Sequence, residues 1–348
     1  MRVSSRYPMI SLLAFLLFAG CALFCRHIVS PAPESSSIRH RADIGATKAL
    51  PEDRAAPESS TASGASATLA AQTSSSASAA SGASAETPSS SEMASWMGKH
   101  AFAGYPRSVS PRSAFILLEN IGYDIGYSEN YKTPVWAVYR CAWIADAKSP
   151  GPRPARFRTD KRTTARVRHE DYAQADYATA ANPFDRGHMA PNFAIGSRYG
   201  RQAQLETFLM SNVCPQRAAL NQQTWEALEE RIAGEYAQEC NIVWVVVGPI
   251  FGETTNRLNG VAAIPEAFYM ILLDVHGNAL RALAVQMNQD VSGAQPLRPY
   301  VVTIRKIEQE AGLDFFSELP DATQESLETS APDPAWDIDA VMKPNDGQ

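Results

Sequence analysis

The stretch DRGHMAPN, residues 185–192, sets an imidazole beside a guanidinium in a short segment that also holds turn-forming residues. Histidine is the side chain best suited to take up a proton near neutral pH, so His188 is predicted to be a general base. Gly187 is predicted to let the backbone come close to a ligand. A single histidine is more often a core residue, but the neighbours Asp185 and Arg186 favour a functional role.

A second group of polar residues follows in SNVCPQ, residues 211–216, and LNQQTWEALE, residues 220–229. On an α-helix Glu229 would lie about 80° round from Asn221 after two turns, so that both side chains lean toward one site. Amide and carboxylate oxygens are ligands suited to Mg²⁺, Mn²⁺ or Ca²⁺. The alternative is that Asn221 only caps an ordinary amphipathic helix.

These motifs together resemble the DNA/RNA non-specific endonuclease family, which includes secreted bacterial nucleases and mitochondrial endonuclease G. The likeness runs from about Tyr123 to Val285 and rests on DRGHMAP, TFLMSNVCPQ, LNQQTWEALE and VVVGPIF. It implies an α+β chain with the ββα-metal (His-Me finger) fold, in which helices flank a central, mostly antiparallel sheet. It also implies a metal-dependent, sugar-non-specific endonuclease that hydrolyses DNA and RNA with little sequence preference.

The resemblance implies a role for each matching residue. His188 falls on the general base, and Asn221 on the single direct protein ligand of one Mg²⁺, with Mn²⁺ or Ca²⁺ as alternatives. Glu229 falls on the acidic residue that orients the water shell of the metal. Arg186 falls on an arginine near the phosphate, and Asn212 on an asparagine that supports the site.

A basic segment precedes the motif, and only Asp160 opposes its charge. Read alone, it fits a solvated loop as well as a polyanion-binding surface, and the net charge of −6 excludes neither. The resemblance implies an upstream arginine that holds phosphate, but Ala155 stands at that place in one alignment. The substrate-binding candidates are therefore Arg153, Arg156 and Arg158. The seven cations of the segment are Arg153, Arg156, Arg158, Lys161, Arg162, Arg166 and Arg168.

The N-terminal third predicts export. Residues 1–29 carry arginines and then an apolar run, as in a signal peptide, and LFAGC at 17–21 resembles a lipoprotein signal with Phe18 in place of leucine. Plain cleavage, lipid anchoring at Cys21 and an uncleaved membrane anchor all stay open. Each places the protein in the periplasm, on the cell envelope or outside the cell. Residues 30–95, rich in Ser and Ala, predict a disordered linker.

The remaining chain predicts one endonuclease domain at 96–319 and a loose, acidic, proline-containing tail at 320–348. Apolar runs predict strands, a helical period predicts a helix at 221–235, and Gly277-Asn278 predicts a hairpin turn. A short helix is expected within 299–311. The expected strands are 115–118, 123–127, 134–140, 207–212, 241–248, 268–275 and 279–287.

Three cysteines of the domain, Cys141, Cys214 and Cys240, have no metal-ligand spacing, which leaves one disulfide or buried thiols. Two other functions compete with the nuclease: an inactive, surface-tethered module that binds nucleic acid, and a narrower phosphodiesterase. A zinc hydrolase is disfavoured because the sequence has no HExxH motif and no Cys/His cluster. The sequence assigns no oligomeric state.

Overall fold

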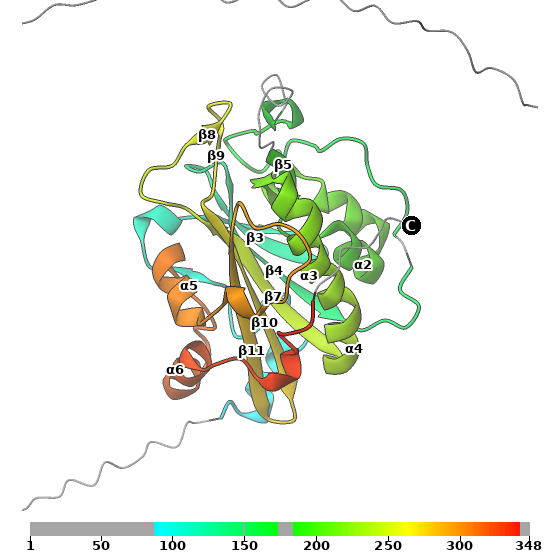
Figure 1. Cartoon of the computed structure of the whole chain (residues 1–348), viewed down its shortest axis with the longest axis vertical. Coiled ribbons are helices and arrows are strands. Elements are labelled where there is room, and N and C mark those ends of the chain that lie inside the picture. Colours follow the sequence, from blue (N-terminus) through cyan, green and yellow to red (C-terminus); the bar gives the residue numbers. More distant parts are fainter. Residues whose placement is uncertain (1–86, 149, 173–183, 342–348) are drawn as a thin grey trace, which may run out of the picture. The chain divides into compact units, whose positions relative to one another are not determined.

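A seven-stranded antiparallel sheet organises the described part of the chain, with the strand order β12-β11-β10-β7-β4-β3-β2 (Figure 1). The computed structural model describes residues 87–148, 150–172 and 184–341. The predictions for residues 1–29 and for most of 30–95 lie outside these residues. The strands are β2 (Ile116–Glu119), β3 (Tyr123–Ser128), β4 (Thr133–Ala142), β7 (Ile242–Ile250), β10 (Ala267–His276), β11 (Ala279–Asn288) and β12 (Val301–Val302).

The central strand β7 explains why the sheet is covered on both faces. Its residues alternate between two apolar clusters: Val243, Val245 and Val247 belong to one, Trp244 and Val246 to the other. Successive side chains of a strand point to opposite faces, so an unbroken apolar run must be buried on both. Burying each such side chain stabilises the fold by about 1.5–3 kcal/mol.

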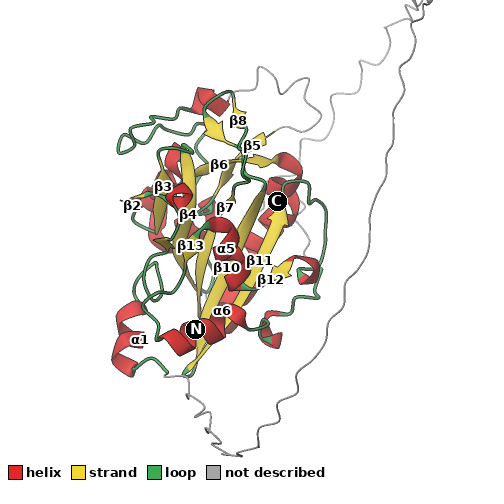
Figure 2. Cartoon of the chain, turned by 90° about the vertical axis from the view of Figure 1, so that its left-hand side faces the viewer, coloured by secondary structure: helices red, strands yellow, loops and turns green. Residues whose placement is uncertain are grey.

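Helices cover the two faces of the sheet separately. In Figure 1, α2 (Asn192–Thr207), α3 (Glu226–Arg231) and α4 (Ala237–Cys240) lie on one side of it. Figure 2 views the other side, where α5 (Ile304–Ala311) and α6 (Asp321–Thr329) lie. No helix of the described residues has both the length and the apolar character needed to cross a membrane.

The helix expected at 221–235 is present, but it is not a plain α-helix. Two π-helical turns, Leu220–Trp225 and Ile232–Tyr236, flank α3, and α4 follows the second. Each π-turn holds more residues than an α-turn and shifts the phase of the residues after it. We call the whole helical segment Leu220–Cys240 the rod. Its apolar face, including Trp225, Leu228 and Ile232, is buried.

A separate two-stranded unit carries the DRGH motif: β5 (Phe184–His188) pairs antiparallel with β6 (Val213–Arg217). The prediction of a strand at 207–212 is wrong. Thr207 ends α2, residues Met210–Asn212 form a 3₁₀ turn, and the strand begins only at Val213. A short buried apolar run has no periodicity that separates a strand from other buried structure.

The segments at both ends of the predicted domain are more ordered than expected. Helix α1 (Ser90–Trp96) lies in the stretch expected to be linker, because Ser89 and Glu92 form a capping box. The tail predicted to be loose forms α6, and Trp336, only 2% exposed, packs on Tyr236 with ring centroids 5.1 Å apart. The tail is ordered because one aromatic side chain anchors it in the core.

The other predicted elements are close to those observed. The hairpin of β10 and β11 turns at Gly277, whose φ of 63° suits glycine, and the short helix within 299–311 is α5. Cys141, Cys214 and Cys240 are free thiols, which decides against a disulfide among them. The remaining strands are β1 (Arg107–Ser108), β8 (Arg257–Leu258), β9 (Ala262–Ala263) and β13 (Leu313–Asp314).

Candidate active site

The β5–β6 unit places His188 at the end of a strand, opposite Val213. Gly187 faces Gln216 on the partner strand, and a side chain at Gly187 would collide with that glutamine. The glycine is therefore required by the close approach of Gln216, and the ligand contact predicted for it is not needed to explain it.

Asn212 fixes the backbone that follows His188. Its side-chain oxygen accepts a hydrogen bond from the Ala190 N–H at 2.9 Å, and its amide donates to the Ala190 and Thr207 carbonyls at 2.9 and 3.0 Å. Its own carbonyl accepts from the Met189 N–H at 3.0 Å. Asn212 is fully buried and contacts the backbone on both sides of Met189, so its hydrogen bonds position this segment.

His188 is held between two aromatic rings. The ring centroids of Phe157 and Phe208 each lie 5.0 Å from the imidazole, which is 9% exposed. Among the described residues, its Nε2 atom has no hydrogen-bond partner. Burial, with a smaller effect of Arg153, lowers the pKa of His188 to about 3. The imidazole is therefore neutral at physiological pH and can accept a proton.

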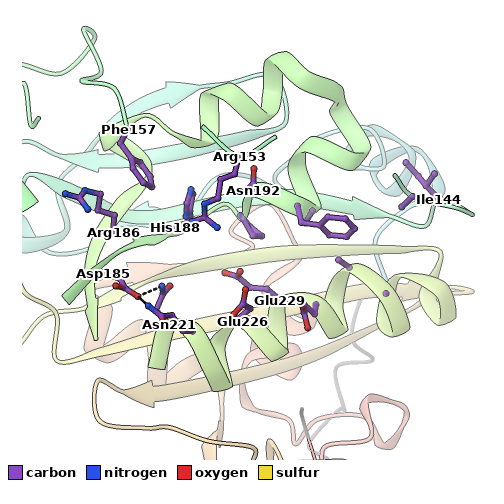
Figure 3. Close-up of a pocket in the computed structure, with 18 of the residues that line it drawn as sticks. Ile144, Arg153, Phe157, Asp185, Arg186, His188, Asn192, Asn221, Glu226 and Glu229 are labelled. Carbon is purple, nitrogen blue, oxygen red and sulfur yellow. Dashed lines mark hydrogen bonds between the residues drawn. The ribbon is translucent and has the colours of Figure 1, made fainter. Parts of the chain in front are cut away.

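A cavity of about 760 Å³ opens in front of His188 (Figure 3). Its walls come from β5, from the start of α2, from the rod Leu220–Cys240 and from the loop that follows β4. Four of the residues singled out from the motifs line it. They are Arg186, His188, Asn221 and Glu229.

Asp185, the first residue of the motif, orients the Asn221 amide. The Asn221 Nδ2 donates to Asp185 Oδ2 at 2.8 Å, and the Gln222 Nε2 donates to the same oxygen at 2.7 Å (Figure 3). Because the amide nitrogen is engaged, the Asn221 oxygen is left as an acceptor on the other side of the group. Such an oxygen is a suitable ligand for a hard divalent cation.

The π-turn aligns Asn221 with Glu229. A plain α-helix would leave them about 80° apart, whereas the extra residue of the π-turn Leu220–Trp225 brings the angle to about 20°. Asn221 and Glu229 both line the cavity. The alternative that Asn221 is an N-cap is wrong, because the rod is already helical at Ala219 and Leu220.

Glu229 lies where a cation would be favourable. Burial, followed by the neighbouring Glu226, raises its pKa to about 8. A divalent ion on the Asn221 oxygen would stabilise the ionised carboxylate and relieve its repulsion with Glu226. The residues present therefore fit one hydrated divalent metal ion.

The basic segment contributes less to the cavity than its charge suggested. Arg153 lines it, with its guanidinium 5.6 Å from the Phe208 ring centroid. Arg156 instead pairs with Glu170, and the Arg158 Nη2 donates to the Leu205 carbonyl at 2.9 Å. Neither belongs to the described lining of the cavity. Arg186 lines it and also donates to the His169 carbonyl at 2.9 Å.

Sequence reasoning gave no role to several residues that shape the site. Asp185 was visible within the motif, but its bond to Asn221 depends on the approach of β5 and the rod. Phe157 and Phe208 enclose His188 from two loops, and although Phe208 stands in TFLMSNVCPQ, no local pattern indicates that either ring contacts His188. Glu226 lines the cavity one turn before Glu229, and that spacing was available as a signal.

Comparison with known proteins finds nucleases among the relatives of this chain. A nuclease of Nostoc is 26% identical over 256 residues, which cover 68% of this chain and 88% of the relative. Bovine mitochondrial endonuclease G is 31% identical, with 57% of this chain and 68% of that protein covered. The nuclease of Serratia marcescens is 28% identical, with coverages of 60% and 77%.

The fold is shared with a solved structure. A chain from the crystal structure of the EndoG/EndoGI complex matches with a TM-score of 0.52 and 22% identity, covering 67% of this chain and 93% of that one. The α+β fold with a central antiparallel sheet flanked by helices, the ββα-metal type, is therefore confirmed. The model of the DNA/RNA non-specific endonuclease family matches residues 108–322, and this chain belongs to that family.

Proposed function

We propose that the chain is a metal-dependent endonuclease that hydrolyses phosphodiester bonds of both DNA and RNA with little sequence preference. The observation that carries this proposal is the meeting of His188, Asn221 and Glu229 in one cavity. They come from the β5 strand, a π-turn and α3, which are separate elements of the chain. The family to which the chain belongs gives the reaction class.

His188 serves as the general base. His188 lines the cavity, and its neutral imidazole carries a lone pair on one ring nitrogen, so a water molecule at that nitrogen can give up its proton there. The water oxygen then attacks phosphorus in line with the leaving 3′ oxygen. The rings of Phe157 and Phe208 limit the movement of the imidazole and exclude competing water from its faces.

Arg186 and Arg153 bind the phosphate. Both line the cavity, and guanidinium groups make charge-assisted hydrogen bonds with phosphate oxygens. The positive charge of Arg153 adds to the larger effect of burial in disfavouring protonated His188 before substrate arrives. The negative charge of the phosphate offsets that effect and makes proton transfer to the imidazole more favourable.

The Asn221 oxygen would hold the metal directly, and Glu229 would hold its water shell. When bound, a divalent ion supplies positive charge that stabilises the developing charge on the phosphate and on the leaving oxygen. Oxygen ligands alone favour Mg²⁺, with Mn²⁺ or Ca²⁺ as alternatives. Asp185 keeps the Asn221 amide in the orientation that presents its oxygen.

Low sequence preference follows from which substrate atoms the site contacts. His188, Arg186, Asn221 and Glu229 are all assigned to the phosphate, the water or the metal, which are the same for every base and for both sugars. Base identity therefore has little influence on the chemical step.

The test uses the purified full chain on supercoiled plasmid and on RNA, with Mg²⁺ and with excess EDTA. Cleavage of both substrates with Mg²⁺, and its loss with EDTA, is expected. Binding without cleavage would instead identify the inactive tethered module. A small phosphodiester cut efficiently while both polymers stay intact would identify the narrower phosphodiesterase. Cleavage unaffected by EDTA would contradict the metal requirement.

We also propose that the chain is exported through residues 1–29. The support is the apolar run after two arginines and the LFAGC sequence at 17–21. Fractionation of cells that express the wild type and the Cys21→Ala variant tests this. Both proteins should be found outside the cytoplasm, and a wild type retained in the cytoplasm would contradict export. Loss of membrane association in the variant alone would identify lipid anchoring.

A further inference from the structure

The cavity in front of His188 is larger than the chemistry at its polar end requires. A hydrated ion fills about 30 Å³ for each water, or roughly 200 Å³ for six. The cavity holds about 760 Å³. Figure 3 shows Ile144 at the end opposite Asp185 and Arg186, with His188 between them. The space beyond the catalytic residues is therefore open to another part of the substrate.

Three large apolar side chains line this cavity and remain accessible to solvent. Trp143 is 38% exposed, Ile144 36% and Phe193 43%, although residues of this kind are normally buried. We name this group, Trp143, Ile144 and Phe193, the apolar platform. Exposed aromatic rings inside a concave site are typical of ligand contacts.

The platform is held in place by backbone contacts. Trp143 and Ile144 directly follow β4, and the Trp143 N–H donates to the Asn241 carbonyl at 2.7 Å. Phe193 lies in the first turn of α2, which begins four residues after His188. The Arg198 Nε of α2 donates to the Ala142 carbonyl at 2.9 Å and so ties the two parts together.

The carboxylates that line the cavity disfavour a second phosphate in it. Asp146, Glu226 and Glu230 line the same cavity, whereas its lining arginines are Arg153 and Arg186 among the described residues. Figure 3 places Arg186 at the end away from Ile144. Carboxylates repel a phosphodiester, but they tolerate a neutral ring. A planar, uncharged group attached close to the scissile phosphate fits these surroundings.

We propose that the apolar platform is a stacking subsite for the nucleobase next to the scissile phosphate. The proposal rests on the proposed endonuclease function. Stacking on aromatic side chains is tolerant of sequence because every base has a π-face, so the subsite adds binding without base selection. A base can reach the platform only after it leaves the stack of a duplex. The subsite therefore assists single-stranded DNA and RNA more than intact duplex.

The test uses the full chain and a single-stranded oligonucleotide in which every linkage but one is a methylphosphonate, so that only one bond can be cut. A second substrate replaces the base on one side of that bond with an abasic sugar, and a third replaces the base on the other side. The variants are Phe193→Ala and Trp143→Ala, with Phe193→Tyr and Trp143→Phe as conservative partners. Val109→Ala, at an exposed apolar residue outside the cavity lining, is the control.

For the wild type, removing one of the two bases should lower kcat/KM by about 5- to 150-fold, the range expected for loss of one stacked base. Each alanine variant should lower kcat/KM on the complete substrate and should show a smaller difference between the complete and the abasic substrate. The conservative variants should keep the wild-type kcat/KM and the wild-type difference. The loss on duplex plasmid should be smaller than on the single strand. The Val109→Ala variant should match the wild type throughout.

Equal losses on complete and abasic substrates would assign the platform a structural role and overturn the proposal. Alanine variants that cut the complete oligonucleotide at the wild-type rate would do the same. Failure of the endonuclease function is distinguishable, because the wild type would then leave plasmid, RNA and oligonucleotide uncut in the presence of Mg²⁺.

Discussion

Two neighbouring regions of the molecule differ in what their polar side chains contact. In the first, the motif region, β5 and the rod Leu220–Cys240 direct Asp185, His188, Asn221 and Glu229 toward one cavity. In the second, the basic segment 153–168, the described side chains mostly bind partners nearby. Arg156 pairs with Glu170, and Arg158 donates to the Leu205 carbonyl.

The difference shows that density of charge along a sequence does not measure charge at a site. The Arg162 guanidinium contacts Asp160 and the Glu119 carbonyl, so it ties the basic segment to the end of β2. Arg153 is the residue of the segment that lines the cavity with its charge. Mutations in the motif region should therefore change catalysis, and most of those in the basic segment should change stability or binding slightly.

The largest effect is expected at His188. His188→Ala removes the proton acceptor and should lower kcat by about 10²- to 10⁴-fold, the usual contribution of a general base. Initial rates on plasmid with saturating Mg²⁺ measure it, and circular dichroism checks that the fold is kept. His276→Ala, which replaces an exposed histidine at the end of β10 and outside the described cavity lining, is the matched control and should lose at most a few-fold in kcat. Near-normal cleavage by His188→Ala would remove His188 from the mechanism.

The next effect is expected at Asp185, which contacts Asn221 rather than the reacting atoms. Asp185→Ala frees the Asn221 amide to rotate and should raise the Mg²⁺ concentration needed for half-maximal activity by about 10- to 100-fold. Asn221→Ala should affect the metal response more strongly. A Mg²⁺ titration of each variant at fixed substrate measures this. Unchanged half-maximal concentrations would show that neither residue supports the metal.

A smaller effect separates the arginines of the basic segment. Arg153→Ala should lower kcat/KM by about 10-fold, because a guanidinium bound to phosphate is worth about 1.5–3 kcal/mol before solvent screening. Arg156→Ala should stay within about threefold of the wild type, because its partner is an exposed glutamate. Single-turnover and steady-state assays at one ionic strength compare the two. Equal losses would make the whole segment a substrate track.

Several elements of the fold could be predicted because local chemistry determines them. The hairpin at Gly277-Asn278 follows from a turn signal between two apolar runs, and β7 follows from its continuous apolar sequence. Residues 207–212 could not be assigned, since a buried 3₁₀ turn and a buried strand share the same composition. The docking of Trp336 depends on Tyr236, one hundred residues away, and no local pattern encodes it.

The site, like the fold, has features that the sequence predicts and features that depend on tertiary packing. The motif identified His188, Asn221 and Glu229, which all line the cavity, since residue types at fixed spacing carry chemical information. The π-turn Leu220–Trp225 has no residue signature in LNQQTW, so the sequence predicted a plain α-helix there. Phe157 and Phe208 reach His188 through tertiary packing alone.

The smallest expected effect is on the pH dependence of the free energy of unfolding. It compares one carboxyl group from each region, and the pKa shifts of the two groups have opposite signs. The pKa of Glu229 is raised to about 8, so between about pH 4.5 and pH 8 the folded chain keeps a proton that the unfolded chain loses. The wild type should lose stability as pH rises through this window. Glu229→Gln removes the titrating group and should become more stable than the wild type by about 1–2 kcal/mol at pH 8, with little difference at pH 5.

Asp160 in the basic segment gives the opposite result. Burial raises its pKa, but hydrogen bonds from Arg162 and Ser211 outweigh burial and hold the pKa below its ordinary value. The Asp160 carboxylate therefore stabilises the fold above about pH 4, and this stabilisation is lost only in acid. Asp160→Asn should lower the free energy of unfolding by about 1–3 kcal/mol, equally at pH 5 and at pH 8. Urea unfolding in EDTA at both pH values measures the two variants together. A pH-independent difference for Glu229→Gln would mean that the carboxyl is already ionised without metal, and would weaken the electrostatic case for a cation beside it.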